Sequence, residues 1–119
     1  MIEQKSYMTR KTILIGQDSF YIALPVKVSG TANTIIKAGE PLTGDVATRL
    51  STEFEVDTTD AVGVLLHEVV LDASGKGNGT IVVAGCIDKL KLEASVLTNI
   101  ETAKEIGLAN IIVTEGSAI

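Results

Sequence analysis

The chain contains a single histidine, His67, and histidine is the side chain most often used as a general base or metal ligand near neutral pH. A catalytic histidine needs an acidic group that orients its ring and a cleft that admits a substrate. The adjacent Glu68 cannot orient it if the segment is a strand, because successive side chains of a strand point to opposite faces. We therefore expect a structural or interface role for His67, and no catalytic residue.

Cys86 is the only cysteine, and its neighbours are apolar: Val-Val-Ala-Gly precedes it and Ile87 follows it. A single cysteine cannot form a disulfide within the chain. Apolar surroundings raise the pKa of a thiol and leave little of the nucleophilic thiolate. We interpret Cys86 as a small core residue, and no cysteine and histidine spacing indicates a metal site.

Two lysines have neighbours similar to those of known functional motifs. Lys76 lies in Gly-Lys-Gly-Asn-Gly-Thr, residues 75–80, but a phosphate-binding loop needs four residues between its first glycine and Gly-Lys, and a helix after it. Lys89 follows Asp88 in a way that resembles lipoyl carrier domains, which present the modified lysine at a tight hairpin tip. No glycine or asparagine adjoins Lys89. We expect a solvent-facing strand residue there and no cofactor, and a lipoyl-type carrier stays an alternative.

The composition predicts one small β-rich domain. The 119 residues are 45% hydrophobic but only 3% aromatic, so the core must consist of aliphatic side chains, which favour strands when they are branched. The net charge of −5 disfavours nucleic acid and anionic membranes as partners. No apolar stretch approaches the roughly 20 residues needed to cross a bilayer, and residues 1–12 lack the apolar run of a secretion signal. We expect synthesis in the cytoplasm.

Residues 1–11 are polar and mixed in charge, which predicts a flexible arm before a single domain over residues 12–119. Segment 61–71 is nearly continuous apolar sequence and should form the central strand, buried on both faces. The glycine-rich residues 72–79 should form a hairpin-like return. Pro25 should place its strand at a sheet edge or interrupt it. Strands are expected at 12–15, 20–28, 34–36, 53–56, 61–71, 80–92 and 109–113, with turns at 30–33 and 37–42.

One short helix is expected near the end of the chain. Thr98 and Glu101 match a capping box, and Gly107 should end the helix about two turns later. Ile100 and Ile106 would dock it on the sheet, since a helix of that length is marginal alone. Residues 45–60 carry five acidic side chains and one basic side chain and should form a solvated surface.

Three segments together resemble bacteriophage head decoration and head fibre-base proteins. They are Ile-Lys-Ala-Gly-Glu-Pro-Leu at 36–42, Asp-Ala-Val-Gly-Val-Leu-Leu-His-Glu-Val at 60–69 and Gly-Thr-Ile-Val-Val-Ala-Gly-Cys-Ile-Asp at 79–88. A short helix followed by Ala-Asn-Ile-Ile-Val at 109–113 is also similar to this group. The resemblance spans about residues 34–113, and none of its motifs carries chemistry.

The resemblance implies the β-tulip fold of lambda-type decoration proteins, which form trimers at the threefold positions of the capsid. It implies binding to the major capsid protein on the outer surface of the virion, and an N-terminal arm that orders against that protein. Capsid contacts are expected from Tyr7, Met8, Thr9 and Arg10. Arms of lambda-type proteins are rich in Thr, Pro and Gly, whereas residues 1–11 contain neither Pro nor Gly.

The residues themselves agree with such a role. Cementing a shell needs a rigid body with self-complementary apolar surface and an arm that spans a seam, and it needs no enzymatic activity. The aliphatic excess in segment 61–71 predicts a trimer contact or core strand at Val64, Leu66 and His67. The alternatives are the base of a head fibre and a carbohydrate-binding surface module. A carbohydrate-binding module needs aromatic side chains that stack on sugar rings, and this chain has only four: Tyr7, Phe20, Tyr21 and Phe54.

Overall fold

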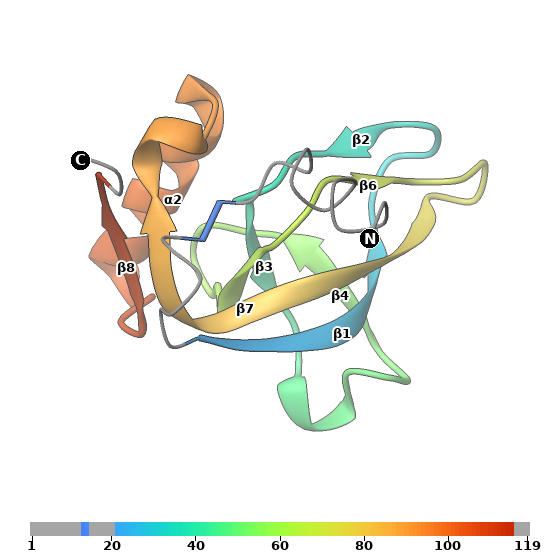
Figure 1. The fold of residues 1–119 in the computed structure, drawn as a ribbon. Coiled ribbons are helices and arrows are strands. Elements are labelled where there is room, and N and C mark those ends of the chain that lie inside the picture. The colour runs from blue at the N-terminus through green and yellow to red at the C-terminus, as the bar shows by residue number, and fades with distance from the viewer. Residues whose placement is uncertain (1–12, 15–20, 116–119) are drawn as a thin grey trace, which may run out of the picture.

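The structure is a computed structural model that describes residues 13–14 and 21–115. Strands predominate in this part of the chain, and the α-helix α2 (Ala94–Ile106) precedes the last strand (Figure 1). The expected mainly β domain with a helix near its C-terminal end is thereby confirmed. The predicted arm at residues 1–11 lies outside the described residues, as do Thr12, residues 15–20 and residues 116–119.

Five of the strands close into a ring, which gives the expected barrel-like body. The ladders join β1 to β4, β4 to β3, β3 to β5, β5 to β7, and β7 back to β1. β2 and β6 form a separate two-stranded ribbon, and β8 extends the sheet from β7 in parallel. The strand bounds are β1 (Ile22–Ser29), β2 (Ile35–Ile36), β3 (Pro41–Thr43), β4 (Glu53–Val56), β5 (Gly63–Leu65), β6 (Val69–Val70), β7 (Lys76–Asp88) and β8 (Ile111–Thr114).

The apolar side chains divide into two clusters on opposite faces of the β5–β7 ladder. Leu65 and Ile81 point into the ring, whereas their neighbours Val64 and Val82 point out of it, toward α2. We call the inner cluster the barrel core: Val26, Val28, Ile36, Leu42, Phe54, Leu65, Val69, Leu71 and Ile81. We call the cluster between the sheet and α2 the helix-side core: Ile13, Leu14, Val64, Val82, Ile87, Ile100, Ala103, Leu108 and Ile111.

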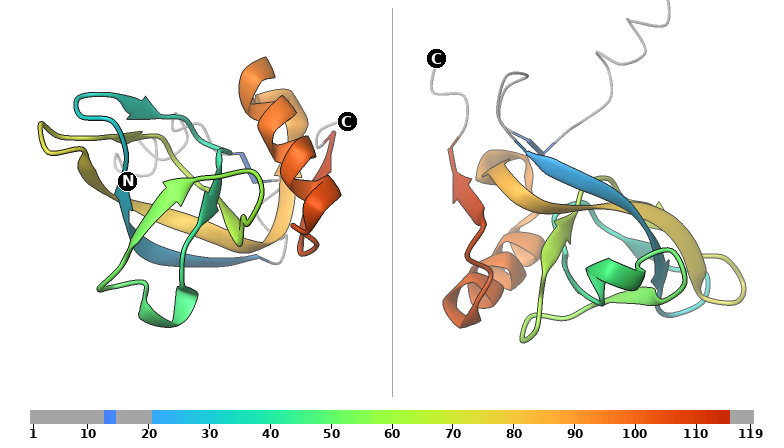
Figure 2. Two further views of the ribbon diagram at one scale, coloured as in Figure 1. Left: turned by 180° about the vertical axis from the view of Figure 1, so that it is seen from behind. Right: turned by 90° about the horizontal axis from the view of Figure 1, so that it is seen from below.

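The strand β7 changes partners along its length. Residues 76–84 pair with β1, whereas residues 85–88 pair with β8, so that α2 and β8 lie together beside the ring (Figure 2). The register with β1 shifts near Val83, which has no partner in the ladder. Gly85 follows with φ of +153°, a backbone conformation that other residues rarely adopt. The bulge and this glycine let one strand serve both the ring and the β7–α2–β8 unit.

The expected long central strand at 61–71 is wrong, because the structure divides it into β5 and β6. The chain bends at Leu66 and His67, after the Leu66 N–H donates to the Thr80 carbonyl at 2.8 Å. Beyond the bend, Val69 pairs with Ile36 in the separate ribbon. The bend brings Val69 and Leu71 back to the barrel core, which a straight extension of β5 could not reach.

The helix is longer than expected, because it begins at Ala94 rather than after a cap at Thr98. The Thr98 hydroxyl donates to the Ala94 carbonyl at 3.1 Å, so Thr98 lies within the helix and the predicted capping box is wrong. Of the two predicted docking residues, Ile100 is buried, as expected, whereas Ile106 is 55% exposed and does not dock the helix; Val96 and Ala103 are the other buried residues of α2. Gly107 ends the helix, as expected.

The glycine-rich turn is shorter than expected, since β7 already begins at Lys76. The turn closes at Gly75, which has φ of +76° and whose carbonyl accepts from the Gly30 N–H at 2.9 Å. A Cβ atom on Gly75 would lie 2.3 Å from the Gly30 carbonyl oxygen, so no other residue fits there without movement. A second predicted turn, at 37–42, also ends early, because Pro41 opens β3.

Pro25 occupies the kind of position that was predicted for it. Among the described residues it has one ladder partner, Thr80 of β7, because β4 reaches only Lys27 and Val28 on the other side of β1. A proline is tolerated there because no neighbouring strand requires its missing N–H.

Candidate functional site

A cavity of 480 Å³ lies where the turn after β2, the bend between β5 and β6 and the start of α2 meet. Its volume falls within the range of small-ligand pockets, about 300–1,000 Å³. Charged side chains supply most of its polar lining. The described residues that line it are Ile13, Lys37, Ala38, His67, Glu68, Lys91 and Glu93.

An ion pair lies at this cavity. Lys37 Nζ is 2.8 Å from Glu93 Oε1, and about half of each side chain is exposed to solvent. The hydrogen bond to Glu93, followed by its negative charge, raises the pKa of Lys37. His67 and Glu68 both line the cavity, contrary to the expected opposite faces, because the chain bends at this point. The arrangement suits ionic contact with a small polar group.

A second candidate site is an apolar surface that extends from the first residue of β1 across the ends of β7 and β8. The pairs Ile22–Ala84 and Cys86–Ile112 each place two side chains on the same side of the sheet. Tyr21 lies beside Gly85, where an added Cβ atom would be 2.9 Å from the tyrosine Cβ and 3.5 Å from Val82 of the helix-side core. We call the surface made by the four residues of the two pairs the outer face: Ile22, Ala84, Cys86 and Ile112.

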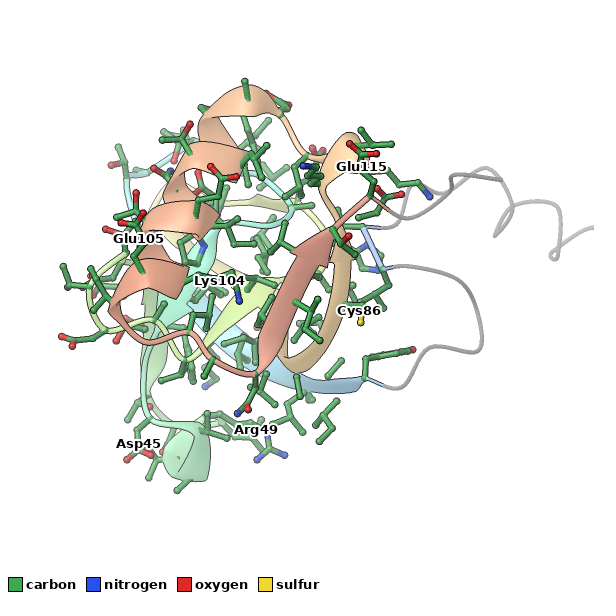
Figure 3. All side chains as sticks on the ribbon, turned by 90° about the vertical axis from the view of Figure 1, so that its left-hand side faces the viewer. Asp45, Arg49, Cys86, Lys104, Glu105 and Glu115 are labelled. Carbon is green, nitrogen blue, oxygen red and sulfur yellow. The ribbon has the colours of Figure 1, made fainter. Side chains whose placement is uncertain are left out.

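The outer face lies on the side of the sheet opposite α2. Ile87 and Ile111 alternate with Cys86 and Ile112 along the two strands and are completely buried in the helix-side core. In Figure 3 the sulfur of Cys86 and the amino group of Lys104, which belongs to α2, lie to opposite sides of β8. The predicted core position of Cys86 is wrong, since the residue is only partly buried.

The structure separates the residues predicted to form the trimer contact. Val64 is completely buried in the helix-side core of its own chain, and Leu66 packs partly against the same core. His67 lies apart from them at the cavity. The predicted capsid contacts Tyr7, Met8, Thr9 and Arg10 lie outside the described residues.

Lys89 lies in a turn rather than in the expected strand. Asp88 Oδ1 accepts from the Leu90 N–H at 3.0 Å and thereby starts the short 3₁₀ helix η2 (Lys89–Lys91). The Lys89 ammonium is 3.9 Å from the Glu115 carboxylate, and the side chain is 40% exposed. The position differs from a hairpin tip, since α2 begins at Ala94, with two residues between it and the end of η2.

The acidic segment 45–60 forms the expected solvated surface, which includes β4 and the 3₁₀ helix η1 (Val46–Thr48). Its five acidic residues and Arg49 give it a net charge of −4. Asp57 is half-buried, and hydrogen bonds from the Thr59 hydroxyl and N–H lower the pKa of its carboxyl. The other four carboxylates, on Asp45, Glu53, Glu55 and Asp60, belong to exposed residues.

The described residues contain neither a group of metal ligands nor a membrane-spanning helix. Within residues 13–14 and 21–115, no three histidine, cysteine, aspartate or glutamate residues form a group that could hold a metal ion. No helix in the described part is long and apolar enough to span a membrane.

Sequence reasoning missed both the cavity and the outer face. The cavity depends on the bend at Leu66, and the outer face depends on the register shift near Val83, which only the pairing of β1 with β7 reveals. Ile111, Ile112 and Val113 are all aliphatic, so the sequence does not show which side of β8 the helix covers.

Comparisons with known proteins do not assign the chain to a family. No protein-family model matches it, and no curated protein matches it significantly. Function therefore has to be inferred from the fold, from its surfaces and from the resemblance of residues 34–113.

Proposed function

We propose that this chain is a non-enzymatic decoration protein of a tailed bacteriophage, which binds the outside of the head as a homotrimer and stabilises the shell. Its partner would be the major capsid protein, and its location would be the outer surface of a virion assembled in the bacterial cytoplasm. The observation that carries the proposal is the spatial arrangement of the three segments that resemble head decoration proteins.

These segments are distant in sequence but adjacent in the sheet. Segment 36–42 contains most of β3, segment 60–69 contains β5, and segment 79–88 contains most of β7. β3, β5 and β7 are consecutive neighbours in the strand order. Chance matches to short β segments would have no reason to fall on three strands that pair with one another, so the resemblance covers one structural unit.

The physical properties of the body suit a cementing role. A closed ring of strands leaves few open sheet edges and gives a rigid body. Several large apolar side chains remain exposed outside the ring, among them Ile35, Val70 and Ile112. Exposed apolar patches of this kind mark surfaces that contact other proteins.

The proposed attachment to the capsid involves the predicted arm. An extended segment that pairs with a strand edge of the shell satisfies its backbone groups, and Tyr7 and Met8 would fill pockets between these hydrogen bonds. Ordering a chain costs about 1–2 kcal/mol per backbone residue, so a single arm binds weakly. Three arms on one trimer raise the avidity by roughly 10² to 10⁴ fold.

Co-sedimentation with phage heads tests the proposal. Expanded heads that lack this protein are mixed with the full chain and with a chain that lacks residues 1–10, and each mixture is sedimented. We expect the full chain to pellet with the heads and to raise their resistance to heat. The truncated chain should fold and trimerise normally but bind much more weakly. A full chain that stays in the supernatant at every head concentration would refute the proposal.

The alternatives make different predictions. The base of a head fibre would bind the same heads but also retain a longer fibre protein. A carbohydrate-binding module would bind glycans in an array without any head present. A carrier domain would show a lipoyl or biotinyl mass adduct on Lys89, where we expect the unmodified intact mass.

A further inference from the structure

The outer face, which consists of Ile22, Ala84, Cys86 and Ile112, has the properties of a self-contact surface. We infer that this face packs against the same face of two further copies around the threefold axis of the trimer. The inference rests on the proposed homotrimer and goes beyond it by naming the surface that holds the three copies together.

The first support is the incomplete covering of the β7–β8 sheet. Parallel strands joined by a helix are almost always covered on both faces. Here α2 covers the face that carries Ile87 and Ile111, and both residues are completely buried. On the opposite face, Ile112 is 55% exposed and Cys86 is only partly buried. That side is therefore open to an apolar partner.

The second support is the continuity of this surface. Ile22 is also exposed, at 42%, and it pairs with Ala84 of β7. The patch thus spans three adjacent strand segments of β1, β7 and β8. Its four residues carry no carboxylate and no amine, and Asp88, the next residue of β7 on this side, is buried.

The third support comes from charge, because it favours a second copy of this chain as the occupant. The exposed residues Leu50, Val56 and Val62 form part of, or lie beside, the acidic segment 45–60, whose net charge is −4. Two copies that met there would bring like charges together, which opposes association.

The exposed pair Ile35 and Val70 on the β2–β6 ribbon has the same disadvantage, since the exposed acids Glu68 and Asp72 flank β6. The outer face combines exposed residues of neighbouring strands with the absence of exposed carboxylates among them, whereas the exposed Leu90 stands alone between Lys89 and Lys91. The nearest ion pair, Lys89 with Glu115 at the end of this sheet, is balanced in charge.

Symmetry then specifies which residue lies nearest the axis. A surface patch meets its own copies in a threefold trimer only close to the rotation axis. Ile112 is the most exposed aliphatic side chain of the outer face, so we place the three Ile112 side chains together at the axis. At the axis each Ile112 side chain is covered by its two copies.

A pair of matched substitutions tests this arrangement. Ile112 and Ile106 are both 55% exposed, but Ile106 lies on α2, away from the outer face. The mass of each variant in solution is measured by light scattering, and folding is checked by circular dichroism. We expect I106D to remain a trimer at three times 12.5 kDa and I112D to fall to 12.5 kDa while still folded. A folded I112D trimer would overturn the inference.

A disulfide test gives an independent readout. In a C86S background, I112C places one thiol per chain at the proposed axis, and I106C serves as the control. Oxidation of the I112C trimer should link two of its three chains and leave the third unlinked, because a third thiol has no partner. The I106C control should stay unlinked. Absence of linked dimers in I112C would contradict an axis at this residue.

The outcomes separate this inference from the proposed function. If I112D stays trimeric and still decorates heads, the self-contact surface lies elsewhere and the proposed decoration function stands. If the wild-type chain has a mass of 12.5 kDa both free and on heads, the inference fails together with the trimer. Binding to heads by such a monomer would leave only the capsid-binding part of the proposed function.

Discussion

The two halves of β7 lie in different surroundings, although they belong to one strand. Residues 76–84 pair with β1, and β5 joins them on the other side at Ile81 and Val82. At these two residues the barrel core and the helix-side core cover the two faces of the strand. Residues 85–88 pair with β8, and in this half α2 covers one face while the outer face keeps Cys86 partly exposed.

This difference separates the part of the molecule that holds the fold from the part available for contacts. Around Ile81 and Val82 the first half has partners on both sides and on both faces, so a change there removes contacts within the chain. Among the described residues no element covers the exposed Ile112 on the outer face, so a change of this side chain removes few contacts within the chain. We expect substitutions in the two halves to affect stability and assembly separately.

The largest effect is expected from a charge in the enclosed part of the sheet. Val64→Asp would bury an unpaired carboxylate opposite Val82, at a cost of several kcal/mol against the roughly 5–15 kcal/mol that stabilise a domain. We expect a largely unfolded protein in circular dichroism. Leu66→Asp, at a half-buried site, should cost less. Equal melting temperatures for Val64→Asp and wild type would show that the enclosed half is not essential.

A smaller effect is expected from a cavity in the barrel core. Phe54 is completely buried and is the largest buried side chain, so Phe54→Ala should lower the free energy of unfolding by about 3–5 kcal/mol. Urea denaturation measures this loss. Ile112→Ala on the outer face is the matched comparison, and at low protein concentration it should change stability by less than about 1 kcal/mol. Similar losses at both sites would remove the distinction between the two halves.

A still smaller effect is expected at the junction of the two halves of β7. Gly85→Ala places a Cβ atom 2.9 Å from the Tyr21 Cβ, at a φ that strains any other residue. Such strain costs about 1–3 kcal/mol. We expect a lower melting temperature together with weaker trimerisation, because the strand segments on both sides shift. Gly107→Ala is the control, since nothing lies near its Cβ position.

The smallest effect concerns the turn that precedes the enclosed half. The N–H groups of Lys76 and Ser74 donate to the Asp72 carboxylate at 3.0 and 2.8 Å and lower its pKa. Because the folded pKa is below the unfolded pKa, this carboxylate stabilises the fold above the unfolded pKa, and the gain is lost as the pH falls through the folded pKa.

We therefore expect Asp72→Ala to lower the melting temperature slightly at pH 7 and hardly at all at a pH below the folded pKa. Asp60→Ala, which changes another exposed aspartate, should change the melting temperature less at pH 7. The same deficit of Asp72→Ala at both pH values would show that the carboxylate charge contributes nothing.

Local signals in the sequence predicted much of the fold. The strand at 53–56 and the end of α2 at Gly107 were placed correctly, because alternation and glycine act over a few residues. The division of segment 61–71 was missed, because Val64 and Leu65 are equally apolar but point into different cores. Which core each joins depends on β7, which follows later in the chain.

The candidate surfaces were less predictable than the fold. The outer face results from an unpaired residue at Val83. The isolated Gly85 is a local signal for a bulge, but it does not show which strands pair on either side or which face stays exposed. The helix start was misplaced because the Thr98 hydroxyl bonds to a carbonyl within the helix instead of capping it. Surfaces of this kind depend on pairing between distant segments, whereas strands depend on nearby residues.

Electron cryomicroscopy of expanded phage heads saturated with this protein tests the central proposal most directly. We expect trimeric density on the outer surface at the threefold positions, into which three copies of the barrel fit with their Ile112 side chains meeting near the axis. Heads that remain bare at saturating protein would contradict the decoration function. Density for single, separate copies would contradict the trimer.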